Sequence, residues 1–554
     1  MTFWELFFRL LLRRPWDALS ALYWRITRRR VRAFNRLRTG TANLPFAYRF
    51  WIRTIERNRQ RENDFKLIAA RWRWQPRFAI LIHCRRGCTD DRLRRSITSI
   101  ERQLYAAWTV IESLNDPGCG EYDFVVPVRA GDSLSKVALF RFAEAIQADS
   151  HATVLYGDQD ELDPRGRRRR PWFKPGWNPE MFLAQDFLSA AVAIKRSVIL
   201  EFVGRDAPDL HTLLLSATST DNGAVVHVPH ILCHVNPQPD EELSGARVEA
   251  VTRHVQSLGA STVAGLFGTI KVQWPLPAEP PLVSIIIPTR DALEVLRPCI
   301  ESVLRLTTYE RFEIVVVDNG STDAATLAYF EDLASEPTIR ILRYDAPYNY
   351  SAINNWAAEM ATGSYLCLLN NDTEVLEPDW LTEMMRYAVR SDVGAVGAKL
   401  LYADGTIQHA GVVIGMGEGA GHAHRFQPSG EAGYFGQPHV AQFVSAVTAA
   451  CLVVAKTKFQ AVGGLDAQNL AIAYNDVDHC LKLQAAGWRN VYVPHAVLLH
   501  HESKSRGSDV SPEHVERYTR ELRVLQERWG TKSYQDPLHN PNLDRYSETF
   551  LLRL

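Results

Sequence analysis

The sequence contains little cysteine and no apolar run long enough to cross a membrane. Only 8 of its 554 residues are cysteine. None of them stands in a CxxC pair, and several, such as Cys367, fall inside apolar runs. This pattern argues against a disulfide framework or a zinc site and predicts reduced core residues of a cytosolic protein. The apolar stretch 3–12 is interrupted by Glu5 and Arg9, is too short for a membrane span, and is followed by no small-residue cleavage site.

The net charge is zero, since 63 basic residues balance 63 acidic ones. The overall charge therefore gives no indication of nucleic-acid binding. The charge is uneven, however, because residues 1–40 hold ten arginines and only two acids, a local net of +8. We predict that this segment binds an anionic membrane surface; a helix packed on the protein's own body with a solvated basic face is the alternative. Pro15 should break or begin a helix there. Apolar residues recur in it at helical spacing: Phe8, Leu12, Trp16, Leu19, Tyr23 and Ile26.

The most informative stretch is residues 366–373, an apolar run that stops on Asn370, Asn371 and Asp372. Such a run predicts a strand buried on both faces, and ligands gather beyond the carboxyl ends of parallel strands. A hard divalent cation takes oxygen ligands and keeps substrate phosphates in its shell, so Asp372 could dock Mg²⁺ or Mn²⁺ with a diphosphate. A strand followed by an ordinary Asn-Asp turn is the alternative.

Two further strands upstream give this site a context. Residues 283–291 form an apolar run that ends in polar residues, a helical pattern follows, and residues 312–321 form a third run with Asp318 near its end. Strand, helix and strand at this spacing predict a right-handed parallel unit, with Asp318 placed to accept a hydrogen bond from a base or ribose. The order of these signals predicts a nucleotide-binding half-domain.

Five motifs in order resemble those of family-2 glycosyltransferases with the GT-A fold. They are residues 287–291, 317–321, 349–355, 369–372 and 474–478. The resemblance implies an inverting transfer from a nucleotide sugar to an acceptor hydroxyl, assisted by Mg²⁺ or Mn²⁺. The family usually has Asp-x-Asp at the strand end, whereas Asn370 stands here at the first position and leaves Asp372 as the single acid.

The resemblance also implies roles for individual residues. Asp476 matches the catalytic base, although a helix N-cap is the alternative for it, with Asn475 as the cap if Asp476 points into the cleft. Asp372 and His500 match the metal ligands, and His501 is the fallback for His500. The expected nucleotide-sugar-binding residues are Pro288, Thr289, Asp291, Asp318, Asn354, Asn370 and Asn371.

A Gly-rich stretch, residues 411–421, is flanked by three histidines. It has the composition of an acceptor-side loop, but glycine-rich segments are flexible by default, so a plain surface loop is favoured. The histidines are His409, His422 and His424.

Residues 77–269 resemble a first, degenerate copy of the same module through residues 96–105, 155–161 and 172–179. Where a metal motif should end a strand, residues 128–132 read Val-Arg-Ala-Gly-Asp, and the preceding half is too short. Asp158 and Asp160 could bind a cation, but an acidic turn is the favoured interpretation. This module would then serve packing, acceptor binding or pairing.

The chain is therefore predicted to be α/β, with two tandem GT-A-like (Rossmann-like) modules, the first degenerate, and helical segments at both ends. The function predicted is synthesis of a bacterial surface polysaccharide or lipid-linked glycan of the O-antigen or rhamnan type, in the cytoplasm or at the inner face of the membrane. A non-catalytic glycan-binding scaffold is the alternative. A processive synthase is weaker, because residues 526–529 lack the Gln-x-x-Arg-Trp spacing. The predicted divisions are 1–74, 75–273, a Pro-rich linker at 274–281, a catalytic domain at 282–510, and 511–554.

Overall fold

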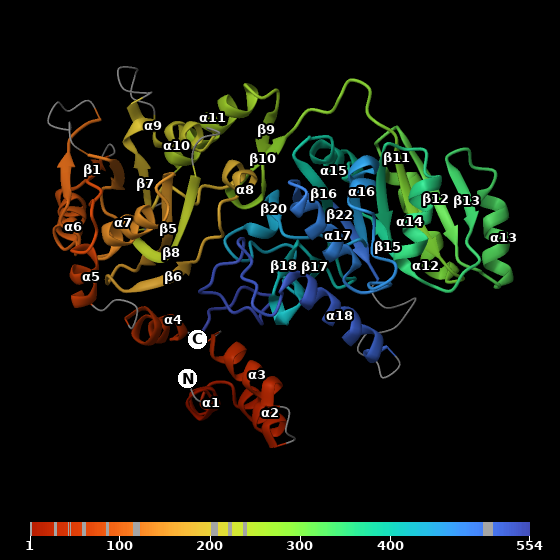
Figure 1. The fold of residues 1–554 in the computed structure, drawn as a ribbon, viewed down its shortest axis with the longest axis horizontal. Coiled ribbons are helices and arrows are strands. Elements are labelled where there is room, and N and C mark those ends of the chain that lie inside the picture. Colours follow the sequence, from red (N-terminus) through yellow and green to blue (C-terminus); the bar gives the residue numbers. More distant parts are fainter. Residues whose placement is uncertain are drawn as a thin grey trace. The chain divides into compact units, whose positions relative to one another are not determined.

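The computed structural model describes residues 3–26, 30–42, 44, 46–57, 62–84, 88–114, 122–200, 209–219, 224–236, 241–501 and 514–554. Contacts divide the chain into two α/β units. The first comprises Met1–Leu258, His539–Ser547 and Leu551–Leu554, and the second comprises Gly259–Leu538 and Glu548–Phe550. Each unit has its own mixed sheet (Figure 1), which confirms the predicted α/β class with two modules. Among the helices of the described part, none is long and apolar enough to span a membrane.

The sheet of the first unit has the order β2-β1-β3-β7-β5-β8-β4, with β6 paired to β5. Strands β1, β2 and β3 run parallel, as expected of a nucleotide-binding half. The strands are β1 (Phe78–His83), β2 (Trp108–Ile111), β3 (Phe124–Arg129), β4 (Ser133–Leu134), β5 (Ala152–Leu162), β6 (Arg168–Trp172), β7 (Val192–Lys195) and β8 (Ala224–Val235). The helices after β1 are α6 (Asp90–Glu101), α7 (Ala138–Ala148), α8 (Pro179–Ala184), α9 (Arg196–Leu200), α10 (Leu210–Thr218) and α11 (Glu241–Gln256).

Helices precede this sheet. Pro15 begins a helix, as its fixed φ and missing N–H allow at a first helical position. Three helices, α1 (Phe3–Leu11), α2 (Pro15–Ile26) and α3 (Arg30–Ala42), share a small core of their own. They pack closely, because a Cβ added at Gly40 would lie 2.8 Å from the Leu10 side chain. The remaining elements are α4 (Ala47–Trp51), the π-helix η1 (Ile52–Glu56) and α5 (Glu62–Ala69).

The two acids of the first unit that could have bound a cation make internal contacts instead. Asp158 and Asp160 lie in strand β5 and are fully buried, so the predicted acidic turn is wrong. Asp160 pairs with His234 at 2.6 Å and with Arg168. Asp158 pairs with His227 at 2.8 Å and accepts the Lys174 backbone N–H at 2.9 Å. The apolar strand context outweighed the turn preference of aspartate, and these partners leave neither carboxylate open to a cation.

The end of the chain completes the shell around Asp158. Asn540 Nδ2 lies 3.0 Å from both Asp158 carboxylate oxygens and 2.8 Å from the Lys174 carbonyl oxygen. We expect Asn540→Ala to lower the free energy of unfolding of the first unit by about 1–3 kcal/mol, because it leaves buried acceptors unsatisfied. Urea unfolding with hydrogen exchange of the β5 amides measures this. Asn469→Ala in the second unit is the control, and equal β5 protection in both variants would refute a structural role for the tail.

The sheet of the second unit has the order β13-β12-β11-β14-β21-β16-β22-β15, with β17 on β16 and β20 on β22. Its strands are β11 (Val283–Thr289), β12 (Phe312–Asp318), β13 (Ile339–Arg343), β14 (Tyr365–Leu369), β15 (Thr373–Val375), β16 (Val393–Leu401), β17 (Ile407–His409), β20 (Gln442–Val444), β21 (Cys451–Ala455) and β22 (Arg489–His500). Two hairpins lie outside it: β9 (Ser261–Ala264) with β10 (Ile270–Gln273), and β18 (Val412–Ile414) with β19 (Ala420–His422). Short 3-10 turns are η4 (Leu266–Gly268), η5 (Met416–Glu418) and η6 (Gln437–His439).

Helices cover both faces of this sheet. Alternate residues of β11 belong to two separate cores, with Ile285 and Ile287 in one and Ile286 in the other. The first core includes Leu296, and the second includes Ile353. Burial on both faces explains why these strands read as unbroken apolar runs. The helices are α12 (Leu293–Leu306), α13 (Ala324–Leu333), α14 (Tyr350–Met360), α15 (Trp380–Ala388), α16 (Lys456–Ala461), α17 (Asn475–Ala485) and α18 (Val515–Trp529).

The Pro-rich stretch packs with the second unit. Lys271 pairs with Glu383 at 3.0 Å, and Arg386 donates to the Trp274 carbonyl oxygen at 2.6 Å. The Arg390 guanidinium lies 4.6 Å from the centre of the Trp274 ring. The contacts therefore divide the chain after Leu258, ahead of the stretch 274–281 that composition marks as the linker.

Candidate active site

The ends of three adjacent strands bring the predicted donor-site residues together. Thr289 ends β11 and stands opposite Asp318, which ends β12. The residues after β14 join them, since Asn371 Nδ2 donates to Thr289 Oγ1 at 3.0 Å. Parallel strands present their carboxyl ends at one edge, so a single ligand can reach all three.

Side chains and backbone amides hold this edge in place. Asp318 accepts the Ser321 N–H at 2.8 Å and pairs with Arg343 at 2.5 Å. Asp291, which adopts φ 51°, accepts the N–H groups of Thr322 and Asp323, both at 2.8 Å. These two hydrogen bonds from Asp291 stabilise the loop after β12. Arg343 was not predicted, because its partner lies on another strand and no local pattern marks it.

Asp372 and His500 approach each other beside this edge. Asp372 follows β14, His500 ends β22, and Asp372 Oδ1 lies 3.2 Å from His500 Nε2. Burial is the largest influence and would raise the pKa of Asp372, but its contacts with His500, with the backbone and with the nearby His501 together lower that pKa. Oxygen and nitrogen ligands at neighbouring positions of one octahedral cation lie roughly 3.0 Å apart, so this pair has the spacing to hold Mg²⁺ or Mn²⁺.

Gln408 fixes the orientation of the His500 ring. Its Oε1 lies 2.6 Å from His500 Nδ1. An amide oxygen only accepts, so Nδ1 carries the proton and the Nε2 of a neutral ring turns its lone pair toward Asp372. A lone pair facing a carboxylate is repulsive unless a proton or a metal ion lies between them. Hydrogen bonds to the far nitrogen orient metal-binding histidines in the same manner.

We expect Gln408→Leu to weaken Mn²⁺ binding about 10–100-fold, the usual loss when the partner of a ligating histidine is removed. Calorimetric titration of Mn²⁺ into the protein with a nucleoside diphosphate measures this. Gln442→Leu is the matched control, because the Gln442 amide donates instead to the Gln437 carbonyl oxygen at 2.8 Å. Equal Mn²⁺ affinity in the two variants would remove Gln408 from the site.

His501 points away from this pair, although it is the next residue. Its Nε2 lies 2.6 Å from Glu374 Oε1, and only its backbone N–H reaches the Asp372 carbonyl oxygen, at 2.9 Å. Successive side chains of an extended segment alternate in direction, so only one of the two histidines can face Asp372. The geometry favours His500 over His501.

Asp476 lies in the first turn of α17, next to the segment that leads into β21. Its Oδ2 accepts the Ala449 N–H at 3.0 Å, and its Oδ1 accepts the Val477 N–H at 2.8 Å. The neighbouring Ala450 carbonyl oxygen accepts the Asn370 N–H at 3.0 Å. Burial raises the pKa of Asp476 in spite of these donors. An acid with a raised pKa, one short segment away from Asn370, suits proton abstraction.

The N-cap of α17 is Tyr474, at φ 61°, without a side-chain capping bond. Asn475 does not cap the helix either, because its Nδ2 donates to the Ile472 carbonyl oxygen at 3.0 Å. Asp476 therefore satisfies one free N–H of the first turn while its other oxygen reaches Ala449.

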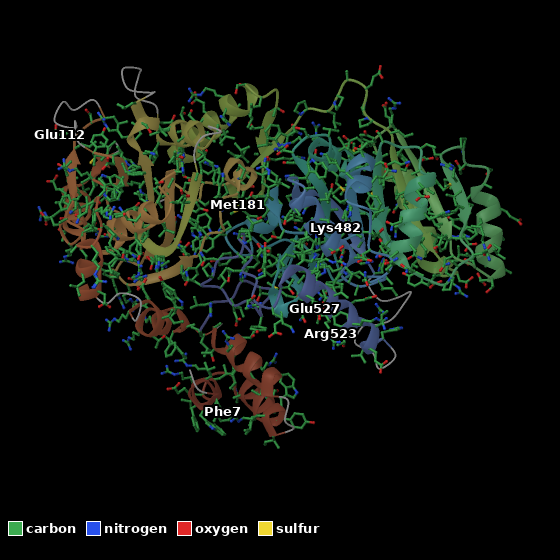
Figure 2. The ribbon with its side chains drawn as sticks, viewed as in Figure 1. Phe7, Glu112, Met181, Lys482, Arg523 and Glu527 are labelled. Atoms are coloured by element: carbon green, nitrogen blue, oxygen red, sulfur yellow. The ribbon has the colours of Figure 1, made fainter. Side chains whose placement is uncertain are left out.

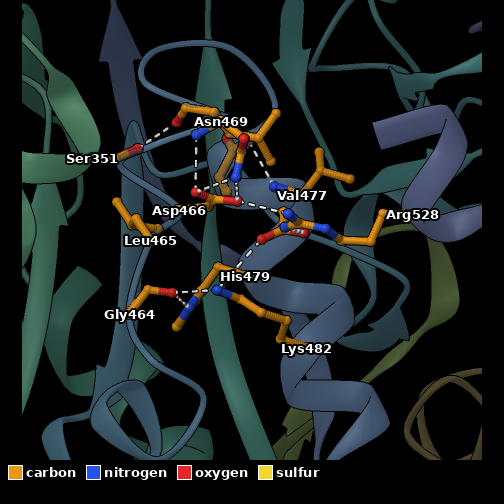
Figure 3. A network of polar contacts seen from close by, with 12 residues as sticks. Ser351, Gly464, Leu465, Asp466, Asn469, Val477, His479, Lys482 and Arg528 are labelled. Atoms are coloured by element: carbon orange, nitrogen blue, oxygen red, sulfur yellow. Dashed lines mark hydrogen bonds and ion pairs between the residues drawn. The ribbon is translucent and has the colours of Figure 1, made fainter. Parts of the chain in front are cut away.

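The loop before Asp476 is held by a polar network (Figure 3). Arg528 of α18 pairs with Asp466 at 2.7 Å and with Asp478 at 2.8 Å. Lys482 donates to the Gly464 carbonyl oxygen at 2.7 Å, and Ser351 of α14 donates to the Leu470 carbonyl oxygen at 2.6 Å. The motif 349–355 thus positions this loop from one side and α18 from the other.

Helix α18 was predicted from its periodicity, but its contribution to the site was not. Glu521 is buried and accepts the Ala473 N–H at 2.8 Å, one residue before Tyr474. Arg523 and Glu527 lie on the exposed side of the helix (Figure 2). The Arg-Trp pair at the end of residues 526–529 could have indicated that this helix contacts the site, because Trp529 Nε1 also donates to Asp478, at 2.9 Å.

The other predicted residues have different surroundings. Pro288 lies within β11, and Asn354 is fully buried in α14, where its Nδ2 donates to the Tyr350 carbonyl oxygen at 2.8 Å. His409 Nδ1 lies 2.9 Å from His422 Nδ1, and the His424 ring stacks on Phe550. The Gly-rich stretch forms the hairpin of β18 and β19 with buried apolar residues, so the predicted plain surface loop is wrong.

Comparisons with known proteins agree with this geometry. Residues 284–450 match the family model Glycosyl transferase family 2. The chain is 40% identical over 441 residues to the uncharacterized protein y4gI of Sinorhizobium fredii (strain NBRC 101917 / NGR234), which covers 76% of this chain and 48% of that protein. It is 36% identical over 440 residues to the O-antigen biosynthesis protein RfbC of Myxococcus xanthus, covering 76% of this chain and 34% of RfbC. The chain thus spans half or less of the length of these two relatives.

A third relative is shorter. The N-acetylglucosaminyl-diphospho-decaprenol L-rhamnosyltransferase of Mycobacterium tuberculosis (strain ATCC 25618 / H37Rv) is 26% identical over 236 residues, which cover 37% of this chain and 72% of that protein. The family match falls on the strands and loops that bear Thr289, Asp318 and Asp372.

Proposed function

We propose that the second unit, whose residues 284–450 match the family model Glycosyl transferase family 2, transfers a sugar from a nucleotide-sugar donor to a hydroxyl group, with inversion at the anomeric carbon. The observation that carries this proposal is the convergence of Asp318, Asp372, His500 and Asp476 at one edge of the sheet. A protein that only bound glycan would have no need for a paired metal site beside an acid of raised pKa.

Each residue has a proposed role. Asp476 removes the proton from the acceptor hydroxyl as the oxygen attacks the anomeric carbon. Asp318, Thr289 and Asn371 bind the nucleotide part, and Asp291 fixes the loop that carries the site. Burial of this edge keeps water from competing with the acceptor.

Asp372 and His500 would hold Mg²⁺ or Mn²⁺, which neutralises the departing diphosphate when bound. Within the described residues no three His, Cys, Asp or Glu side chains form a metal-binding group, so the protein would supply few ligands and the donor phosphates the rest. Asn370 Nδ2 lies 3.3 Å from His500 Nε2, and a half-turn of that amide would present its oxygen instead. A neutral oxygen at position 370 can thus replace the first acid usual in this family.

For the acceptor we propose a glycan or lipid-linked glycan of a bacterial cell-surface polysaccharide. RfbC of Myxococcus xanthus is named for O-antigen biosynthesis, and the Mycobacterium tuberculosis relative for rhamnosyl transfer, so rhamnose is a sugar to test first. We place the protein in the cytoplasm, at the inner face of the membrane and in contact with anionic lipid through residues 1–40. In the first unit, Asp158 and Asp160 of β5 are already paired with histidines of the same unit. This unit would therefore support packing or acceptor binding.

A donor screen tests the proposal. The purified full chain is heated with a panel of nucleotide sugars, with Mn²⁺ or with EDTA, and the unfolding temperature is recorded. At least one donor should protect the second unit with Mn²⁺ and lose that effect in EDTA. Protection by free glycans alone, with no response to any nucleotide sugar, would favour the scaffold alternative.

A further inference from the structure

Helices α1 and α2 have apolar side chains on two opposite faces. The inner face packs against α3 and buries Leu6, Leu10, Ala18 and Ala21 completely. That core is fully formed without the outer face. The outer-face residues are not members of this core, so their exposure requires a separate explanation.

The outer face is exposed to solvent. Its most exposed members are Leu12 at 88%, Trp16 at 80%, Ile26 at 73% and Tyr23 at 62%, followed by Phe8 at 60%. Trp4 and Phe8 are four residues apart in α1, and in α2 the exposed apolar residues recur at three- and four-residue intervals, the spacing of one helical face. They are Trp16, Leu19, Tyr23 and Ile26. Of the 25 exposed large apolar side chains in the described part of the chain, seven lie between Trp4 and Ile26. Such concentration, as opposed to scatter, marks an interaction surface.

Basic side chains lie on the same two helices and on the turn that joins them. Arg9, Arg13, Arg14 and Arg25 are exposed there. The acids are Glu5 and Asp17, and Asp17 pairs with Arg36 at 2.7 Å. An exposed apolar face with aromatic residues and arginines has the composition of segments that lie in the interface of an anionic bilayer.

We propose that the outer face of α1 and α2 is a lipid-docking surface that inserts into the headgroup region of an anionic membrane. Helices of 9 and 12 residues are too short to span a bilayer but can lie in its plane. A second copy of the chain is a poorer occupant, because a symmetric contact would bring the arginine-bearing faces of two copies together. Anionic lipid instead complements the arginines and the apolar face at once.

An inserted apolar face should respond to salt differently from a basic segment alone. Attraction between arginines and anionic headgroups fades at high salt. Insertion of Phe8, Leu12, Trp16 and Ile26 does not, because burial of apolar surface is not screened by ions. Binding should therefore have a part that survives high salt. The inference rests on the contact with anionic lipid proposed above for residues 1–40, and it is independent of the chemistry proposed for the second unit.

The test compares the full chain with the variant Phe8→Ser, Leu12→Ser, Trp16→Ser, Ile26→Ser. Both are sedimented with vesicles made of equal parts phosphatidylglycerol and phosphatidylcholine, at low and high salt. We expect the variant to bind about a hundredfold more weakly or worse, since binding scales with inserted apolar area. The control is Leu67→Ser, Leu266→Ser, two leucines that are each 63% exposed elsewhere. This control should bind as the unsubstituted chain does.

Three outcomes would overturn the proposal. The variant could bind vesicles as tightly as the unsubstituted chain, or the binding of the unsubstituted chain could vanish completely at high salt. The unsubstituted chain could also be a dimer that ignores vesicles and that the variant dissociates, which would give the surface to a second copy. An unchanged unfolding temperature shows that the variant is folded. Unchanged release of nucleoside diphosphate from a soluble donor separates a failure of docking from a failure of the proposed transfer.

Discussion

Asp476→Asn should lower the rate of sugar transfer by about 10²–10⁴-fold or more while leaving donor affinity nearly unchanged, because the loss of a positioned base affects the chemical step. The asparagine keeps the size of the side chain and can still accept the Ala449 N–H. Transfer is measured as product formed with saturating donor, and donor affinity by calorimetry. Transfer at the unsubstituted rate would reduce Asp476 to a residue that satisfies the first turn of α17.

The raised pKa of Asp476 gives this prediction two further signatures. A base must be ionised, so the unsubstituted rate should fall as pH drops through that raised pKa, and the variant's residual rate should lack this dependence. The folded-state pKa lies above the unfolded one, so ionisation at higher pH lowers the stability of the fold. Asp476→Asn avoids this loss and should be at least as stable at neutral pH.

Asp372→Ala and His500→Ala should each weaken donor binding in Mn²⁺ by about a hundredfold or more, since the cation links the protein to the diphosphate and the loss of a ligand exceeds the 10–100-fold effect of an outer partner. His501→Ala is the matched control, because the His501 ring pairs with Glu374 and not with Asp372. Calorimetry with Mn²⁺ and with EDTA separates metal-linked binding from the rest. Equal donor affinity in the His500 and His501 variants, or an affinity that EDTA does not change, would contradict the assignment.

The strands of the second unit and the residues at their ends could be predicted from the sequence. An unbroken apolar run that stops on Asp318 or Asp372 reports burial on both faces and the end of a strand together. Both signals are local, so one stretch of sequence contains them. The start of a helix at Pro15 and the existence of helix α18 could be predicted for the same reason.

Contacts between distant segments could not be predicted. Gln408 lies 92 positions from His500, and Glu521 lies 48 positions from Ala473, so neither pair leaves a spacing in the sequence. Asn540 joins the first unit from the far end of the chain, at 382 positions from Asp158. Tertiary packing also decided that Asp158 lies in a strand, against the turn preference of aspartate.

The most direct test of the account is the initial rate of nucleoside diphosphate release from a panel of nucleotide sugars, with an acceptor glycan and Mn²⁺, by the full chain and by Asp476→Asn. We expect release from at least one donor by the unsubstituted chain, a loss of that release in EDTA, and a loss in Asp476→Asn. Release that persists undiminished in Asp476→Asn, or the absence of release from every donor, would contradict it.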